Sequence, residues 1–89
     1  MDYNFLKREV YMPEKHFRKD RCVKLGKHEN IFFAVLWFSK DHKAPYQLIY
    51  DRVYGYGDVD KKLLISKAKV LRNKGIKVVP IYKYGYKLK

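Results

Sequence analysis

The longest apolar segment of the chain is Ile31–Phe38, eight consecutive residues that leave no polar side chain on either alternating face. Such a run is too short for a self-standing core helix, so it predicts a central strand that is covered on both faces. It is also far shorter than the ~20 apolar residues that cross a bilayer. A chain of 89 residues builds one modest core, and we expect Ile31–Phe38 to lie at its centre.

The segments around this run predict the rest of the sheet. Tyr3–Met12 mixes apolar and charged positions in the manner of a strand, which Pro13 ends because proline has no N–H for a ladder. Tyr46–Tyr54 is rich in β-favouring residues and is expected to form an antiparallel hairpin with Ile31–Phe38. The polar segment 14–26 fits either a short helix or an ordered loop.

A helix is predicted from about Val59 to Asn73. Asp58 can cap its first N–H groups, and Gly75 suits the left-handed residue that ends a helix. At ~100° per residue this helix has an apolar half and a basic half. The apolar half contains Val59, Leu63, Leu64, Ala68, Val70 and Leu71, and the basic half contains Lys61, Lys62, Lys69 and Arg72. The division is broken by Lys67 and Lys74 in the apolar half and by Ile65 in the basic half.

The last part of the chain predicts extended structure. Ile76–Ile81 reads as a strand, and its Pro80 indicates a sheet edge or a strand end. From residue 82 onward the types alternate, so a strand would carry tyrosines on one side and lysines on the other. These are Tyr82, Tyr84 and Tyr86 against Lys83, Lys87 and Lys89.

Together these segments predict a single α+β domain over residues 1–89. It has a three- to four-stranded, mainly antiparallel sheet and one packed C-terminal helix, and a short second helix before Gly26 is an option. An exposed sheet edge offers a route to a homodimer.

The positive charge of the chain is concentrated after its last acidic residue, Asp60. The following 29 residues carry nine lysines, one arginine and no carboxylate, whereas the first sixty carry eleven basic and nine acidic side chains. This segregation predicts a polyanionic partner, because a solubilising surface normally mixes both signs. Lysines hold phosphates as point charges rather than reading bases. The expected phosphate contacts are Lys61, Lys62, Lys69, Arg72, Lys77, Lys83 and Lys87.

Tyrosines accompany the basic segment. Tyr82, Tyr84 and Tyr86 are expected to offer rings on which unpaired bases stack, which favours RNA over duplex DNA. The competing interpretation is structural, because tyrosine is a good strand former and often lines a sheet. We expect a small, non-catalytic RNA-binding protein.

Two other functions fit the same residues. One is an antitoxin-like inhibitor that engages a nuclease or another protein through RNA or through an acidic surface. The other is a small metal-independent ribonuclease similar to messenger-cleaving toxins. Its candidate groups are His16, His28, His42, Asp51, Arg52 and the tyrosines. The arginine-rich strand typical of such toxins is missing near the chain end. An anionic membrane is a weaker candidate, since no Trp or Phe flanks the basic helix.

The lone cysteine, Cys22, excludes an internal disulfide, and the first residues do not resemble an export signal. We therefore expect a cytoplasmic protein. Cys22 and His28 form a single ligand pair without a second half, so no metal site is predicted. Glycine-rich phosphate loops are missing too, and no cofactor is expected. Abundant Lys, Asn, Ile, Tyr and Phe indicate an AT-rich genome, consistent with an accessory protein of a phage or mobile element.

Overall fold

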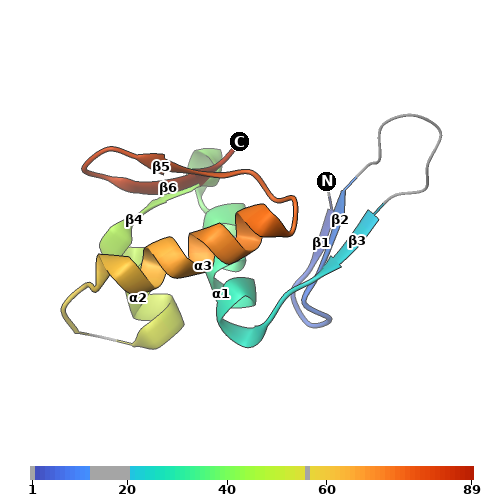
Figure 1. Ribbon diagram of the computed structural model, residues 1–89, viewed down its shortest axis with the longest axis horizontal. Coiled ribbons are helices and arrows are strands. Elements are labelled where there is room, and N and C mark those ends of the chain that lie inside the picture. Colours follow the sequence, from blue (N-terminus) through green and yellow to red (C-terminus); the bar gives the residue numbers. More distant parts are fainter. Residues whose placement is uncertain (1, 13–20, 56) are drawn as a thin grey trace.

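The computed structural model describes residues 2–12, 21–55 and 57–89, which form three α-helices and two three-stranded antiparallel sheets (Figure 1). The N-terminal sheet has the order β1-β2-β3, from β1 (Asp2–Asn4), β2 (Glu9–Met12) and β3 (Arg21–Lys24). The C-terminal sheet has the order β4-β6-β5, from β4 (Lys43–Pro45), β5 (Val78–Ile81) and β6 (Gly85–Leu88). The helices are α1 (Lys27–Phe38), α2 (Tyr46–Tyr54) and α3 (Lys61–Asn73), and a 3₁₀ turn η1 (Lys40–His42) precedes β4.

The three helices form the middle of the molecule, and α1 is the central one because it contacts α2, α3, β4 and β6. The C-terminal sheet covers one side of the helices, and the N-terminal sheet lies at one end of the long axis (Figure 1). The described residues extend over 45 × 26 × 23 Å. No helix among them has the length and apolar character needed to cross a membrane. Over the described residues the fold is thus α+β as predicted, but it has two sheets instead of one, and three helices instead of one packed helix and an optional short second one.

The prediction of a strand at Ile31–Phe38 is wrong, since these residues belong to α1. The helix begins four residues earlier with a polar turn, where the Glu29 carboxylate accepts the Gly26 N–H at 3.1 Å. Its apolar run is continuous because the helix is covered on several sides, and Phe32, Phe33 and Leu36 are fully buried. A buried helix and a buried strand have the same hydrophobic pattern, and only the added first turn distinguishes them.

The prediction of a strand at Tyr46–Tyr54 is also wrong, and so is the expected hairpin with Ile31–Phe38. The segment is α2, which buries Ile49 and Val53 at helical spacing on one face. Gln47 donates to the Asp51 carboxylate one turn later, at 2.7 Å. Packing of this face against the core overrides the β propensity of its tyrosines, isoleucine and valine.

The predicted C-terminal helix is confirmed as α3, with a different first turn. Its N-cap is Asp60, which accepts the Lys62 N–H at 3.0 Å, and not the expected Asp58. The helix ends at Asn73 as predicted, and Gly75 has the positive φ of 94° that a terminating residue needs. Leu64, Ala68 and Leu71 are its buried residues.

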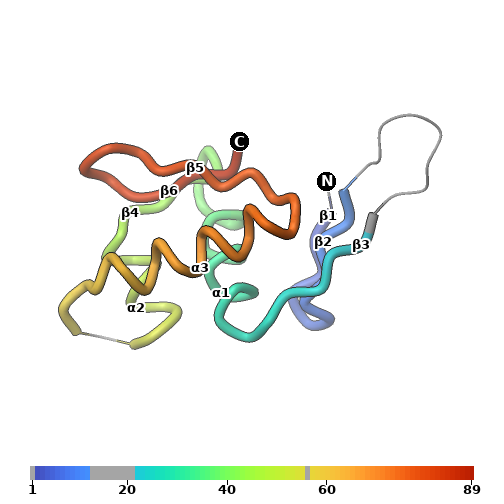
Figure 2. Tube along the Cα trace, viewed as in Figure 1, coloured from blue at the N-terminus to red at the C-terminus, as the bar shows by residue number. Residues whose placement is uncertain are grey.

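The C-terminal sheet differs from expectation in the position of its last strand. β5 is an edge strand, as Pro80 predicts, but it begins at Val78. The predicted extended run from Tyr82 is a turn up to Tyr84, and β6 begins only at Gly85 and lies in the middle of the sheet. The tube in Figure 2 shows this last hairpin beside β4, which pairs with β6 in the same sheet.

The predicted strand at Tyr3–Met12 is two strands joined by a tight turn, β1 and β2, which pair antiparallel. The Tyr3 ring meets Phe33 of α1 at 4.6 Å between centroids, so the N-terminal sheet packs on the central helix. The proposed helix or loop after Pro13 falls largely outside the described residues, and its last part is β3. A homodimer through an exposed edge of either sheet stays a prediction.

Candidate nucleic-acid interface

The C-terminal sheet has one apolar face and one basic face. Ala44, Tyr86, Val78 and Leu88 are buried against the helices. On the opposite face the pairing places Lys87 between Lys43 of β4 and Val79 of β5, and both lysines are exposed. Strand alternation thus puts cations on the outside of this sheet.

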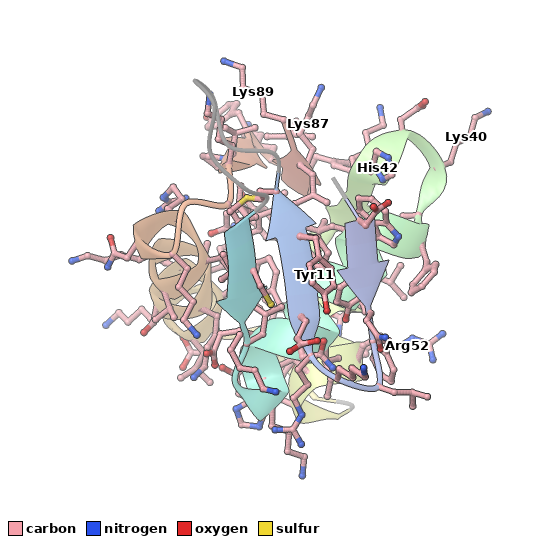
Figure 3. All side chains as sticks on the ribbon, turned by 90° about the vertical axis from the view of Figure 1, so that its right-hand side faces the viewer. Tyr11, Lys40, His42, Arg52, Lys87 and Lys89 are labelled. Carbon is pink, nitrogen blue, oxygen red and sulfur yellow. The ribbon has the colours of Figure 1, made fainter. Side chains whose placement is uncertain are left out.

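The next position along the sheet adds two more lysines. Lys89 donates its backbone N–H to the Lys77 carbonyl at 3.0 Å, and both side chains are exposed. Figure 3 shows Lys87 and Lys89 on the upper side of its view, with Lys40 on the same side and Arg52 far below. A hollow of about 410 Å³ lies here, lined by Arg72, Gly75, Ile76, Lys77, Val78, Val79 and Lys89. Three of these lining residues are cations and none is acidic.

Arg72 connects this hollow to α3. Its Nη1 donates to the Val78 carbonyl at 3.0 Å, which holds the guanidinium between the helix and β5. Arg72 also lines a second hollow, of about 260 Å³, between α3 and the sheet. The second hollow is lined by Tyr46, Lys61, Ile65, Arg72, Pro80 and Tyr86.

The second hollow explains why Ile65 lies in the basic half of α3. Its side chain is 53% exposed, yet it shares a wall with Tyr46 and the edge residue Pro80. The Lys61 Nζ lies 4.9 Å from the centroid of the Tyr46 ring, which is within cation–π range. This hollow therefore combines apolar walls with two cations.

These residues extend from the outer face of the C-terminal sheet to α3, where Arg72 lines both hollows, and we call them together the cationic band. It consists of Lys43, Lys87, Lys89, Lys77, Arg72 and Lys61. Lys69 extends it along α3, since Lys61, Lys69 and Arg72 fall within an arc of about 80° at ~100° per residue. Lys62 is exposed on the neighbouring side of the helix.

Lys67 of α3 and Lys74, the residue that follows the helix, share a structural partner. Lys67 Nζ lies 3.7 Å and Lys74 Nζ 3.5 Å from the carboxylate of Glu29 on α1. Burial alone would raise the pKa of the Glu29 carboxyl. Hydrogen bonds from the backbone N–H groups of Glu29 and Gly26 and the charges of the two ammonium groups have the larger effect, so the pKa lies below its ordinary value. Lys67 and Lys74 thus interrupt the apolar half because they neutralise this half-buried carboxylate.

The three candidate stacking tyrosines divide into two groups. Tyr82 and Tyr84 lie in the β5–β6 turn and are 86% and 39% exposed. Lys83, between them, has its Nζ 5.4 Å from the centroid of the Tyr82 ring. Tyr86 is only 4% exposed, and burial raises the pKa of its hydroxyl. Its ring packs on Phe32, with the centroids 5.4 Å apart, so it belongs to the core and cannot serve as a platform for a base.

Among the residues that the structure describes, the two candidate catalytic histidines are not gathered in one place. The His28 ring packs against Tyr54 at the start of α1, and His42 stacks on Trp37 beyond the end of this helix. A helix of this length separates its ends by roughly 18 Å. His16 lies outside the described residues. Within the described ranges there is no cluster of three or more His, Cys, Asp or Glu side chains that could hold a metal ion.

Sequence reasoning missed several members of this surface. Lys43 follows a polar loop, and nothing local indicates that it pairs with a strand more than forty residues later. Tyr46 lies in a segment that predicts a strand, and no local signal indicates the partners of Ile65 and Pro80. The burial of Tyr86 could have been inferred, because it alternates with Leu88 on one side of a strand.

No protein-family model matches the chain, and no curated protein is significantly similar to it in sequence.

Proposed function

We propose that this protein binds single-stranded RNA in the cytoplasm without cleaving it. The observation that carries this proposal is the cationic band. Its six cations come from α3, β4, β6 and the residues next to β5 and β6, and no acidic side chain lines its two hollows.

The phosphate backbone is the ligand that such a surface suits best. Five of the six cations are lysines, which act as point charges and tolerate many phosphate geometries. Arg72 differs from the lysines because its guanidinium is hydrogen-bonded to the Val78 carbonyl. If all six contact phosphates, the logarithm of the binding constant should fall with the logarithm of salt concentration with a slope of about −4.

The apolar hollow beside the band favours single strands over duplexes. Its walls of Tyr46, Ile65 and Pro80 can receive an unpaired base, while Lys61 and Arg72 hold the adjacent phosphates. Tyr82 and Tyr84 offer further exposed rings near the other end of β6. Base-paired strands present no free ring faces, so duplexes would use only the phosphate contacts.

Non-catalytic binding is preferred to cleavage because His28 and His42 are at opposite ends of α1 and neither lines the two hollows of the band. The test starts with the protein purified at low salt, from which copurifying nucleic acid is recovered and sized over time. Intact RNA is expected. Progressive shortening of the RNA would refute the non-catalytic part of the proposal.

Charge reversal tests the surface itself. The variant Lys77→Glu with Lys87→Glu should weaken binding of a fluorescent single-stranded RNA at least tenfold and lower the salt slope by about 1.4. The matched control, Lys7→Glu with Arg52→Glu, changes the net charge equally at exposed residues outside the band. Circular dichroism verifies that both variants fold. Equal losses in both variants, or no binding of RNA by the unmodified protein, would refute the proposed function.

A further inference from the structure

The turn between β1 and β2 exposes two large apolar side chains. Leu6 is 90% exposed and Phe5 is 45% exposed. This turn lies beside the start of α1, whereas the C-terminal sheet lies on the other side of the helices (Figure 1). It is therefore separate from the cationic band.

The backbone of this turn is firmly anchored, so the exposed side chains have a defined position. The Arg8 N–H donates to the Phe5 carbonyl at 3.2 Å, and Leu25 N–H donates to the Arg8 carbonyl at 2.8 Å. Asn30, only 4% exposed, donates its Nδ2 to the same Phe5 carbonyl at 3.2 Å. The hydroxyl of Tyr3 in turn donates to the side-chain and main-chain carbonyls of Asn30.

A hollow of about 260 Å³ lies between the turn and α1. It is lined by Phe5, Leu6, Arg8, Lys27, Asn30 and Ile31. Three of these residues are apolar, two are cations and none is a carboxylate. Lys7, next to Leu6, is a third exposed cation at the same turn.

We propose that this hollow docks an acidic segment of a protein partner, one that carries a large apolar side chain flanked by carboxylates. The apolar side chain would cover Leu6 and Phe5, and its carboxylates would face Arg8 and Lys27. Burying an aliphatic side chain provides a gain that a nucleic-acid backbone cannot supply, because phosphates and sugars do not cover leucine. This inference is independent of RNA binding at the cationic band.

The test uses a synthetic glutamate-rich peptide that contains leucines and the same peptide with every leucine replaced by serine. Fluorescence anisotropy measures binding to the full chain, and amide chemical shifts locate it. The leucine peptide should bind more tightly and shift the amides of Phe5, Leu6 and Ile31. The variant Leu6→Ser should bind the leucine peptide about tenfold more weakly, as expected for the loss of one buried leucine. Because Leu6 is exposed, this variant should keep its fold and its affinity for RNA.

The matched control is Leu63→Ser, a leucine of α3 that is 39% exposed. It should bind the leucine peptide like the unmodified protein. Equal affinity for the two peptides, no loss in Leu6→Ser, or shifts confined to Lys77 and Lys87 would overturn the proposal. Binding of anionic phospholipid vesicles that depends on Leu6, or a Leu6-dependent dimer in sedimentation, would assign the turn to a membrane or to a second copy and would also overturn it.

Discussion

The Glu29 carboxylate allows a sharp test of how α1 and α3 are held together. Its side chain is 13% exposed, accepts the Gly26 N–H at 3.1 Å, and lies within 3.7 Å of the ammonium groups of Lys67 and Lys74. The variant Glu29→Ala removes the hydrogen bond that begins α1, worth about 1 kcal/mol, and two partly exposed ion pairs, worth about 0.5 kcal/mol each. The expected loss is therefore about 2 kcal/mol. For a chain of this size, that lowers the unfolding midpoint by roughly 8–16 °C.

The variant Glu29→Gln separates the two contributions, because its amide oxygen can still accept the Gly26 N–H while the charge is lost. It should lose about 1 kcal/mol, half of the effect of Glu29→Ala. The control Asp58→Asn removes one charge from an exposed loop carboxylate and should stay within about 0.5 kcal/mol of the unmodified protein. Thermal unfolding followed by circular dichroism measures all three. If Glu29→Gln is as stable as the Asp58→Asn control, the role of the charge is refuted. If Glu29→Ala is no less stable than Glu29→Gln, the role of the hydrogen bond is refuted.

The pH dependence of stability follows from the same group. The pKa of Glu29 is lowered in the folded protein, so its contribution is present above the ordinary value of 4.5 and is lost as the pH falls through the folded value. Urea denaturation should show the stability gap between the unmodified protein and Glu29→Gln closing between pH 6 and pH 3, and a constant gap would contradict this. At Gly85 an added Cβ would lie 1.9 Å from the Ala44 carbonyl oxygen. Gly85→Ala should therefore lower the free energy of unfolding, measured by urea denaturation, by at least about 3 kcal/mol. The exposed control Ser66→Ala should lower it by less than about 0.5 kcal/mol. Nearly equal stabilities of the two variants would refute the close packing of β4 on β6.

The parts of the fold that the sequence predicted correctly are those with local signals. The end of α3 is marked by Gly75, and its buried face by the spacing of Leu64, Ala68 and Leu71. The edge position of β5 follows from Pro80, which has no N–H to donate. Each of these signals acts within a few residues and does not depend on distant partners.

The wrong predictions concern segments whose structure depends on distant contacts. Ile31–Phe38 is apolar throughout because most of this part of α1 packs against other elements, although Phe38 is exposed, and this pattern does not distinguish a helix from a strand. For the candidate site, charge alone predicts the cations of α3. The sequence does not predict Lys43 and Tyr46, because β4 comes next to β6 only through tertiary pairing.

The position of β6 between β4 and β5 has a consequence for how the protein is made. Lys43 pairs with Lys87, so β4 cannot pair with β6 until more than forty further residues have been synthesised. β5 likewise has no neighbour in the C-terminal sheet until the ribosome has passed Leu88. A growing chain therefore carries Lys43 and Lys61 long before it carries Lys87, and the outer face of the C-terminal sheet forms only when β6 is complete. A ligand that holds all three strands together would also favour this late closure by mass action.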